Sequence, residues 1–400
     1  MKYSVSSVPL VSIIILTYRN HDYIFETLDS VFRQNYPNIE LIVSDDGSSE
    51  FPQEEIERYI LHRKDKNIKC IKINCEKQNL GTVKHFNKAL SLTSGEYIIA
   101  LAGDDAFYNE NVVQNYVNNF INSPDEYLIH MAQTAMYDKT LSKLQGYYCK
   151  PDIENALYTN DFSTLFDRLC LFPCLPSTST CFKKKFFEKY GNFNETYLLI
   201  EDWPTHLRIV REKCPILYDN FIAIKHRHGG ISHGGYNALS ETQCKYYQDL
   251  LNIHQKEILP YIDQLSDSTR KRVRDRLMAE DLWIESTIYK SRREYKKYIL
   301  FGIAHPAYNL KIFLINHWTK FRSWAQTGLL GGLGVLLVAP FINPLFETFC
   351  PEYYIRVVQR LLEITACIDV GVSCIFAVLG IIGYLCMRLE TFPSDCLYIG

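Results

Sequence analysis

The segment Tyr97-Ile98-Ile99-Ala100-Leu101-Ala102-Gly103-Asp104-Asp105 joins a short apolar run to two adjacent acidic residues. An apolar run of this length is typical of a strand that is buried on both faces of a parallel sheet. Two neighbouring carboxylates at the end of such a strand repel each other and lose solvation. A bound divalent cation removes both costs, and oxygen ligands suit Mg²⁺ or Mn²⁺. The alternative is an acidic turn that precedes the next helix.

Similar apolar runs occur at residues 11–16, 41–43 and 68–73, and helical patterns separate them. This alternation, with a repeat of about 25–30 residues, predicts an α/β fold with a doubly wound, mainly parallel sheet and right-handed crossovers. Ligands bind such sheets beyond the carboxyl ends of the strands. Polar segments follow three of the strands, so we expect one crevice that is lined by Thr17–Asn20, Asp45–Ser48 and Asp104–Asp105.

The later part of the chain continues the pattern as far as about residue 235. Helices are predicted at 111–122 and 183–190 and strands at 127–134 and 216–224, whereas residues 136–174 show only weak periodicity. Ile200-Glu201-Asp202-Trp203 opens an amphipathic helix, and a basic segment from Lys225 to His233 follows the last strand. The sequence has neither a Gly-x-Gly-x-x-Gly after its first strand nor a Walker loop, which argues against a dinucleotide-binding or P-loop protein.

Length and composition set broad limits on function. The 400 residues are enough for a catalytic domain of about 250 residues and a smaller segment. A net charge of −2 does not suggest a nucleic-acid partner. The 13 cysteines lack metal-binding spacing, and residues 1–9 lack the apolar core of a secretory signal. We therefore expect reduced, structural thiols in the cytosol.

The C-terminal third contains two uncharged apolar segments, Ser323–Phe346 with 24 residues and Val370–Met387 with 18 residues. Each approaches the length that a membrane-spanning helix needs, and basic residues on the outer flanks place both ends in the cytosol. A pair of buried helices in a soluble protein is the alternative. Upstream, residues 270–297 carry ten Lys and Arg against five Asp and Glu. That segment is either a solvated helix face or a basic surface on anionic lipid headgroups.

Five motifs, taken together, resemble glycosyltransferase family 2. They are Val-Ser-Ile-Ile-Ile-Leu-Thr-Tyr-Arg-Asn at 11–20, Ser-Asp-Asp-Gly-Ser at 44–48, Asn79-x-Gly81 with Asn87, Leu-Ala-Gly-Asp-Asp at 101–105 and Glu201-Asp202. The resemblance covers about residues 9–235. It implies a GT-A fold, a nucleotide-sugar donor, a divalent metal (Mn²⁺ or Mg²⁺) and inversion at the anomeric carbon.

The resemblance also implies roles for particular residues. The nucleoside is expected at the ends of the first two strands, with Asp46 accepting a hydrogen bond from a pyrimidine N–H. Asp104 is expected near the ribose and the metal, Asp105 directly on the metal, and Arg227 on the diphosphate. The residues assigned to donor binding are Thr17, Tyr18, Arg19, Asp45, Asp46, Asp104 and Arg227. A plain turn is the alternative for Asp45-Asp46-Gly47.

Asp202 is the predicted general base, because an inverting transfer needs a carboxylate on the face opposite the departing diphosphate. Glu201 is expected to hydrogen-bond the acceptor or the helix start. The alternative is that both residues merely favour a helix N-terminus through charge–dipole attraction. His226 and His228 flank Arg227 in the basic segment, and a structural role is the alternative for each.

The sequence departs from the family pattern at two positions. Ala102 replaces the first Asp of the usual Asp-x-Asp, and Phe86 replaces an Arg that often precedes the second Asn of the Asn-Gly motif. The Gln-x-x-Arg-Trp motif of processive synthases is absent. We therefore expect transfer of a single sugar to a hydroxyl of a saccharide or lipid-linked saccharide, as in surface-polysaccharide assembly.

The predicted organisation is a GT-A domain at 1–238, a helical, partly basic membrane-proximal segment at 239–322, a two-helix membrane hairpin at 323–390 and a tail at 391–400. The expected location is the cell inner membrane, with the catalytic domain on the cytoplasmic side. Two other functions are consistent with parts of the pattern. One is a catalytically inactive membrane scaffold, and the other is a sugar-phosphate nucleotidyltransferase, although residues 17–22 lack the Gly-rich basic loop that such an enzyme needs.

Overall fold

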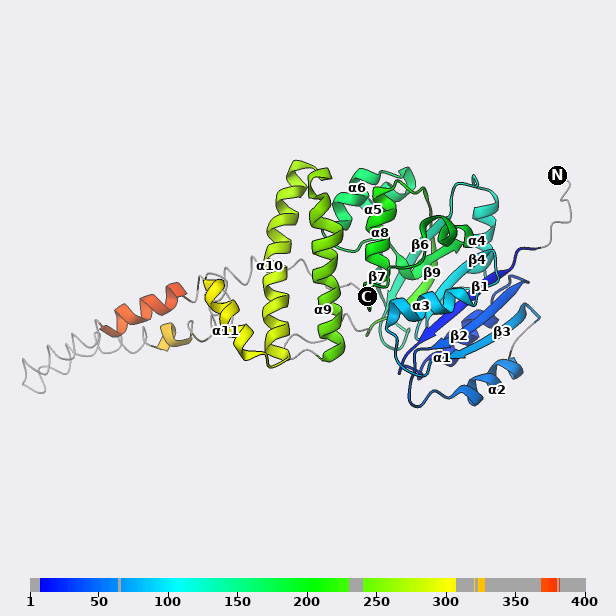
Figure 1. The fold of residues 1–400 in the computed structure, drawn as a ribbon, viewed down its shortest axis with the longest axis horizontal. Coiled ribbons are helices and arrows are strands. Elements are labelled where there is room, and N and C mark those ends of the chain that lie inside the picture. Colours follow the sequence, from blue (N-terminus) through cyan, green and yellow to red (C-terminus); the bar gives the residue numbers. More distant parts are fainter. Residues whose placement is uncertain are drawn as a thin grey trace, which may run out of the picture. The chain divides into compact units, whose positions relative to one another are not determined.

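A computed structural model describes residues 8–63, 66–229, 240–306, 320, 323–327, 368–379 and 381. These residues belong to two compact units, one that extends to Ser291 and one that begins at Arg292. The first unit contains a central sheet with helices on both faces (Figure 1).

The sheet has the strand order β3-β2-β1-β4-β8-β6-β9-β5, and β7 pairs with β6 outside this path. Strands β1 to β4 are mutually parallel, whereas β8 is antiparallel to both β4 and β6. Strand β9 runs parallel to β6 and pairs antiparallel with β5. The strands span Val11–Thr17 (β1), Ile39–Asp45 (β2), Ile68–Cys75 (β3), Tyr97–Ala102 (β4), Ala106–Phe107 (β5), Ile129–Tyr137 (β6), Leu144–Tyr147 (β7), Thr180–Lys183 (β8) and Ile216–Arg227 (β9).

The alternation of side chains along β1 explains why this strand is apolar throughout. Val11, Ile13 and Ile15 belong to one buried cluster, and Ile14 belongs to another on the opposite face. All four side chains are fully buried. A strand with covered faces on both sides has no solvent-facing positions, so its sequence lacks the polar alternation of a half-exposed strand.

Three helices cover the face to which Ile13 points, and their buried side chains share its cluster. They are α1 (Ile24–Phe32), α2 (Gln53–Arg63) and α4 (Val112–Ile121). The cluster on the other face includes buried residues from a larger group of helices. These are α3 (Thr82–Ser91), α5 (Pro151–Thr159), α6 (Phe162–Leu169), α7 (Lys184–Tyr190), α8 (Asp202–Arg211), α9 (Glu241–Ile253) and α10 (Asp267–Ser291).

Helices α9 and α10 lie within the region predicted as a membrane-proximal segment, but they pack in the same compact unit as the sheet. Leu251 of α9 and Val273 of α10, among others, join the cluster that also contains Trp203. The second unit includes α11 (Tyr295–Ala304), and residues 368–379 are helical.

Of the two predicted membrane spans, residues 323–327 of the first and residues 370–379 and 381 of the second are among the described residues, and the others lie outside them. Within the described part of the chain, no helix is both long enough and apolar enough to cross a membrane. The tail at 391–400 also lies outside the described residues.

The prediction of an α/β fold with alternating strands and helices is confirmed, but the sheet is mixed rather than mainly parallel, because β5, β7 and β8 pair antiparallel with their neighbours. Two further expectations change. Residues 136–174, which showed only weak periodicity, contain β7, α5 and α6. The last strand was expected to end at Ile224, but β9 continues through Lys225 and His226 to Arg227 because its end pairs with both β5 and β6. The residues expected in a basic loop therefore begin inside the sheet.

Candidate active site

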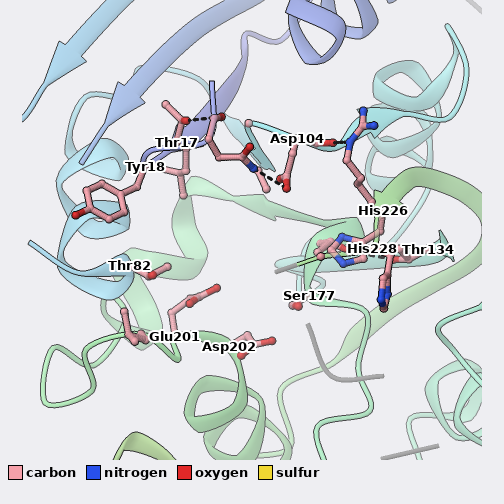
Figure 2. Close-up of a pocket in the computed structure, with 18 of the residues that line it drawn as sticks. Thr17, Tyr18, Thr82, Asp104, Thr134, Ser177, Glu201, Asp202, His226 and His228 are labelled. Atoms are coloured by element: carbon pink, nitrogen blue, oxygen red, sulfur yellow. Dashed lines mark hydrogen bonds between the residues drawn. The ribbon is translucent and has the colours of Figure 1, made fainter. Parts of the chain in front are cut away.

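A cavity of about 660 Å³ opens where β1 and β4 end, as expected for the carboxyl edge of a parallel sheet. Its wall includes the segment after β1, the end of β4, the start of α8 and the end of β9. Figure 2 shows Asp104 on one side of this space and Glu201 and Asp202 on another. Residues from distant parts of the sequence thus share one cavity.

Thr17 at the end of β1, and Tyr18 and Arg19 after it, line the cavity, while their contact with a donor stays a prediction. Arg19 has a φ of 54°, which is uncommon for a residue with a side chain. Its backbone N–H donates to the Ser48 hydroxyl at 2.8 Å, and its guanidinium carbon lies 5.0 Å from the Tyr18 ring centre. Backbone strain of this kind often occurs at functional sites, where surrounding contacts maintain it.

Asp45 and Asp46 lie beside this wall but do not line the cavity. Asp45 accepts hydrogen bonds from the backbone N–H and the hydroxyl of Ser48, at 2.7 and 2.6 Å. Asp46 accepts from the Asn79 amide and from the N–H groups of Leu80 and Gly81, at 2.8 to 3.1 Å. Both carboxylates are at least 97% buried. This geometry corresponds to the turn alternative, and contact with a nucleoside stays a prediction for both residues.

Asp104 is the acidic residue of the Asp104–Asp105 pair that lines the cavity. Its carboxylate accepts a hydrogen bond from the Asn20 amide at 2.8 Å. Burial and the neighbouring Asp105 raise the pKa of Asp104, and His226 and the Asn20 hydrogen bond only partly oppose this. A cation beside Asp104 would stabilise its charged form.

Asp105, in contrast, is 1% exposed and does not line the cavity. One of its oxygens lies 2.9 Å from His226 Nδ1, and the other accepts from the Arg227 backbone N–H at 2.9 Å. The geometry therefore favours Asp104 over Asp105 for contact with a cation. Direct metal binding by Asp105, as the sequence suggested, stays a prediction, while its observed contacts join the end of β4 to β9.

Arg227 lines the cavity, but its guanidinium is largely engaged within the protein. It donates to the carbonyls of Asp104 and Lys139, at 2.8 and 2.5 Å, and to the Glu26 carboxylate at 2.5 Å. Its central carbon lies 3.7 Å from the ring centre of Tyr23, and its side chain is 3% exposed. The predicted grip on a diphosphate would compete with these contacts, so the geometry favours a role in holding the wall together.

Glu201 and Asp202 lie at the start of α8 and line the same cavity as Asp104. Burial, and then the charge of Asp202, raise the pKa of Glu201 to about 8. Asp202 accepts a hydrogen bond from the Trp203 backbone N–H at 2.7 Å. The raised pKa leaves Glu201 protonated near neutral pH, beside Asp202 at the same helix start.

Sequence reasoning left several residues of the cavity wall without a role. Asn20 lies in the predicted loop after the first strand, and its amide donates a hydrogen bond to Asp104. Its place at a strand end, beside the expected ligand crevice, could have identified it. No sequence signal pointed to the other residues, which come from the end of β6, the weakly periodic region, the segment before β8 and α9. They include Thr134, Lys139, Tyr148, Ser177, Thr178 and Tyr246.

Comparison with known proteins identifies the family. Residues 12–191 match glycosyl transferase family 2. An uncharacterised glycosyltransferase from Rickettsia prowazekii is 30% identical over 255 residues, which are 62% of this chain and 72% of that protein. One from Rickettsia felis is 32% identical over 223 residues, 55% of this chain, and this match spans 34% of the relative's length.

A relative from Escherichia coli has a described reaction. It is named UDP-Glc:alpha-D-GlcNAc-diphosphoundecaprenol beta-1,3-glucosyltransferase WfaP, and it is 32% identical over 143 residues. The match covers 36% of this chain and 48% of that protein. With the family match and the Rickettsia prowazekii relative, these findings show that the chain belongs to glycosyltransferase family 2.

Proposed function

We propose that this glycosyltransferase moves a single sugar, with inversion, from a nucleotide-sugar donor to a hydroxyl of a saccharide or lipid-linked saccharide. One observation carries the proposal: Asp104 and Asp202 line the same cavity although 98 positions separate them in the sequence. An inverting transfer needs a residue that binds the donor and a residue that accepts a proton, and both must lie near the same anomeric carbon. The E. coli relative, whose name gives UDP-Glc as donor and a lipid-linked acceptor, supports the substrate classes.

Asp202 is the proposed general base. It accepts the proton of the acceptor hydroxyl while that oxygen attacks the anomeric carbon and the bond to the diphosphate breaks. Its hydrogen bond from Trp203 fixes the orientation of the carboxylate at the helix start. Glu201, protonated near neutral pH, is the proposed hydrogen-bond donor to the acceptor.

The residues on the donor side fit a divalent cation that is held mainly by its substrate. Among the described residues, no group of three or more His, Cys, Asp or Glu side chains could hold a metal. Mg²⁺ is often bound by one or two carboxylates together with substrate phosphates and water. Asp104 is the carboxylate that would contribute to binding the cation, and burial raises its pKa. Such a cation would neutralise charge on the diphosphate as it leaves.

The proposed location is the cytoplasmic side of a membrane, where a lipid-linked acceptor would be available. Support comes from α11, whose Ile299, Leu300 and Ile303 are 60%, 64% and 71% exposed. Lys296 and Lys297 are exposed on the same helix. Apolar and basic side chains together are typical of helices that rest on anionic lipid.

The test is to incubate the purified chain with a panel of nucleotide sugars, with and without Mn²⁺, and to identify the released nucleotide. Release of a nucleoside diphosphate is the expected result. Release of pyrophosphate when a sugar phosphate and a nucleoside triphosphate are supplied would indicate a nucleotidyltransferase. If no substrate is consumed while acceptors are present, the chain is the inactive scaffold and the proposal is wrong.

A further inference from the structure

The cavity must accept a diphosphate although three carboxyl groups line it. Asp104, Glu201 and Asp202 all contribute to its wall. An anion that enters such a space needs positive charge from the protein or from a cation. Arg227, the residue predicted for this purpose, already donates to Asp104, Lys139 and Glu26. Another basic side chain of the cavity wall would add to the positive charge of a bound cation.

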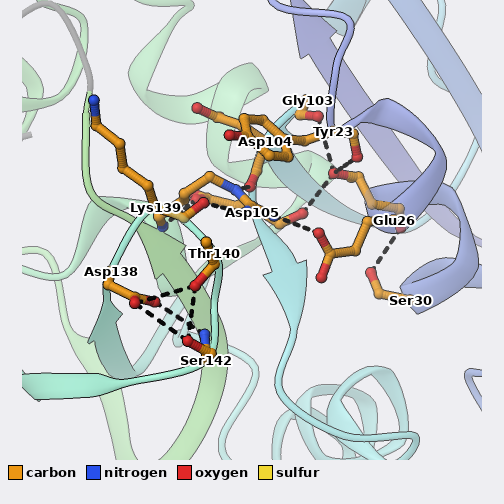
Figure 3. Close-up of polar contacts among 12 residues, drawn as sticks. Tyr23, Glu26, Ser30, Gly103, Asp104, Asp105, Asp138, Lys139, Thr140 and Ser142 are labelled. Atoms are coloured by element: carbon orange, nitrogen blue, oxygen red, sulfur yellow. Dashed lines mark hydrogen bonds and ion pairs between the residues drawn. The ribbon is translucent and has the colours of Figure 1, made fainter.

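Lys139 lines the cavity from the tight loop between β6 and β7. Asp138 organises this loop by accepting hydrogen bonds from the backbone N–H groups of Ser142 and Lys143, at 2.9 and 3.2 Å. Figure 3 shows the Lys139 side chain leading away from these hydrogen bonds. The backbone of Lys139 is thus fixed while its long side chain stays outside the loop's own network.

The Lys139 side chain is exposed, and no hydrogen bond or ion pair of its ammonium group occurs in the part of the chain that the structure describes. Arg227 connects this residue to the donor-side carboxylate, because one guanidinium donates to the carbonyls of both Lys139 and Asp104. The shared partner holds the backbones of Lys139 and Asp104 on the same cavity. A ligand that carries a diphosphate and a cation could therefore meet a basic side chain from one of these segments and a carboxylate from the other.

We propose that the Lys139 ammonium binds the diphosphate of the donor, and that Arg227 positions the backbone of Lys139 and Asp104 without touching the donor. This inference rests on the nucleotide-sugar donor proposed above. Arg19 is the other exposed basic residue of the wall, but its guanidinium lies over the Tyr18 ring. That contact suits Arg19 to the nucleoside end of the donor.

The experiment compares Lys139→Gln with Lys143→Gln in the purified 400-residue chain. Lys143 lies in the same loop, is exposed and does not line the cavity, so it controls for the loss of one positive charge. Calorimetry first identifies which of UDP, GDP, CDP, ADP and dTDP binds the unmodified chain. Binding of that diphosphate and of its phosphate-free nucleoside is then measured for both variants.

Lys139→Gln should weaken diphosphate binding by about tenfold, the usual loss for one hydrogen bond to a charged group, and leave nucleoside binding unchanged. Lys143→Gln should change neither. Unchanged diphosphate binding in Lys139→Gln, or an equal loss for the nucleoside, would overturn the assignment while the proposed function stands. If none of the five diphosphates binds the unmodified chain, the donor class itself is wrong.

Discussion

Raising the pH should stop the reaction by removing the proton of Glu201. The pKa of Glu201 is raised to about 8 because the group is buried and lies beside Asp202. Above that pH, a further negative charge would enter the cavity that is proposed to hold a diphosphate. If the protonated form is the active one, the rate should fall about tenfold for each pH unit above the pKa.

Glu201→Gln provides the sharpest version of this test, because an amide has nearly the shape of the protonated acid and cannot ionise. At pH 7 the variant should keep the rate of nucleoside diphosphate release within about threefold of the unmodified enzyme. Between pH 8 and 10 its rate should stay level. A variant that is inactive at pH 7, or that keeps the alkaline fall in rate, would refute the protonated state of Glu201.

The same raised pKa makes a prediction about stability. The folded protein binds a proton at Glu201 that the unfolded chain has lost between pH 4.5 and about 8, so stability should fall as the pH rises through this range. The loss from this group is on the order of 3–5 kcal/mol, since each pKa unit is about 1.4 kcal/mol. Urea denaturation at several pH values should show this slope in the unmodified chain and a smaller one in Glu201→Gln.

Two further substitutions test the donor-side wall. Asn20→Ala removes a hydrogen bond that favours the charged form of Asp104. The acid limb of the pH–rate profile should therefore move to higher pH, and donor binding should weaken by about tenfold. An unchanged profile would show that this hydrogen bond does not affect Asp104 in the reaction. Gly81→Ala should destabilise the fold by about 2–4 kcal/mol in urea denaturation, because φ is +86° and the new Cβ would lie 2.5 Å from Leu198 Cδ1. Gly191→Ala, at φ +76° with no atom within 4 Å, should cost only about 1–2 kcal/mol, and equal losses would mean that the contact with Leu198 is unimportant.

The architecture was largely readable from the sequence because buried parallel strands leave a simple pattern. The run that became β1 is apolar on both faces, and the polar segments after β1 and β4 did converge on one cavity. The course of β9 past Ile224 was not readable. The polar residues Lys225 to Arg227 continue that strand only because β5 and β6 supply backbone partners, and those pairings join residues far apart in the sequence.

The site was partly predictable, and the limits have a physical cause. Motifs indicated which acidic residues matter, but Asp104 lies in a turn between β4 and β5, where the sequence pattern does not fix the direction of each side chain. The sequence therefore could not tell that Asp104 faces the cavity while Asp105 turns to His226. It also could not show that Arg227 is engaged with Glu26, because 201 positions separate these two residues.

The most direct test of the account is a comparison of donor binding and sugar transfer in Asp104→Asn and Asp202→Asn. Both residues line one cavity, and the proposed mechanism gives them different steps, so the two variants should fail differently. Asp202→Asn should bind the nucleotide-sugar donor as tightly as the unmodified enzyme and transfer sugar about 10²–10⁴ times more slowly. Asp104→Asn should lose donor binding first. Normal turnover by Asp202→Asn, or unchanged donor binding by Asp104→Asn, would contradict the account.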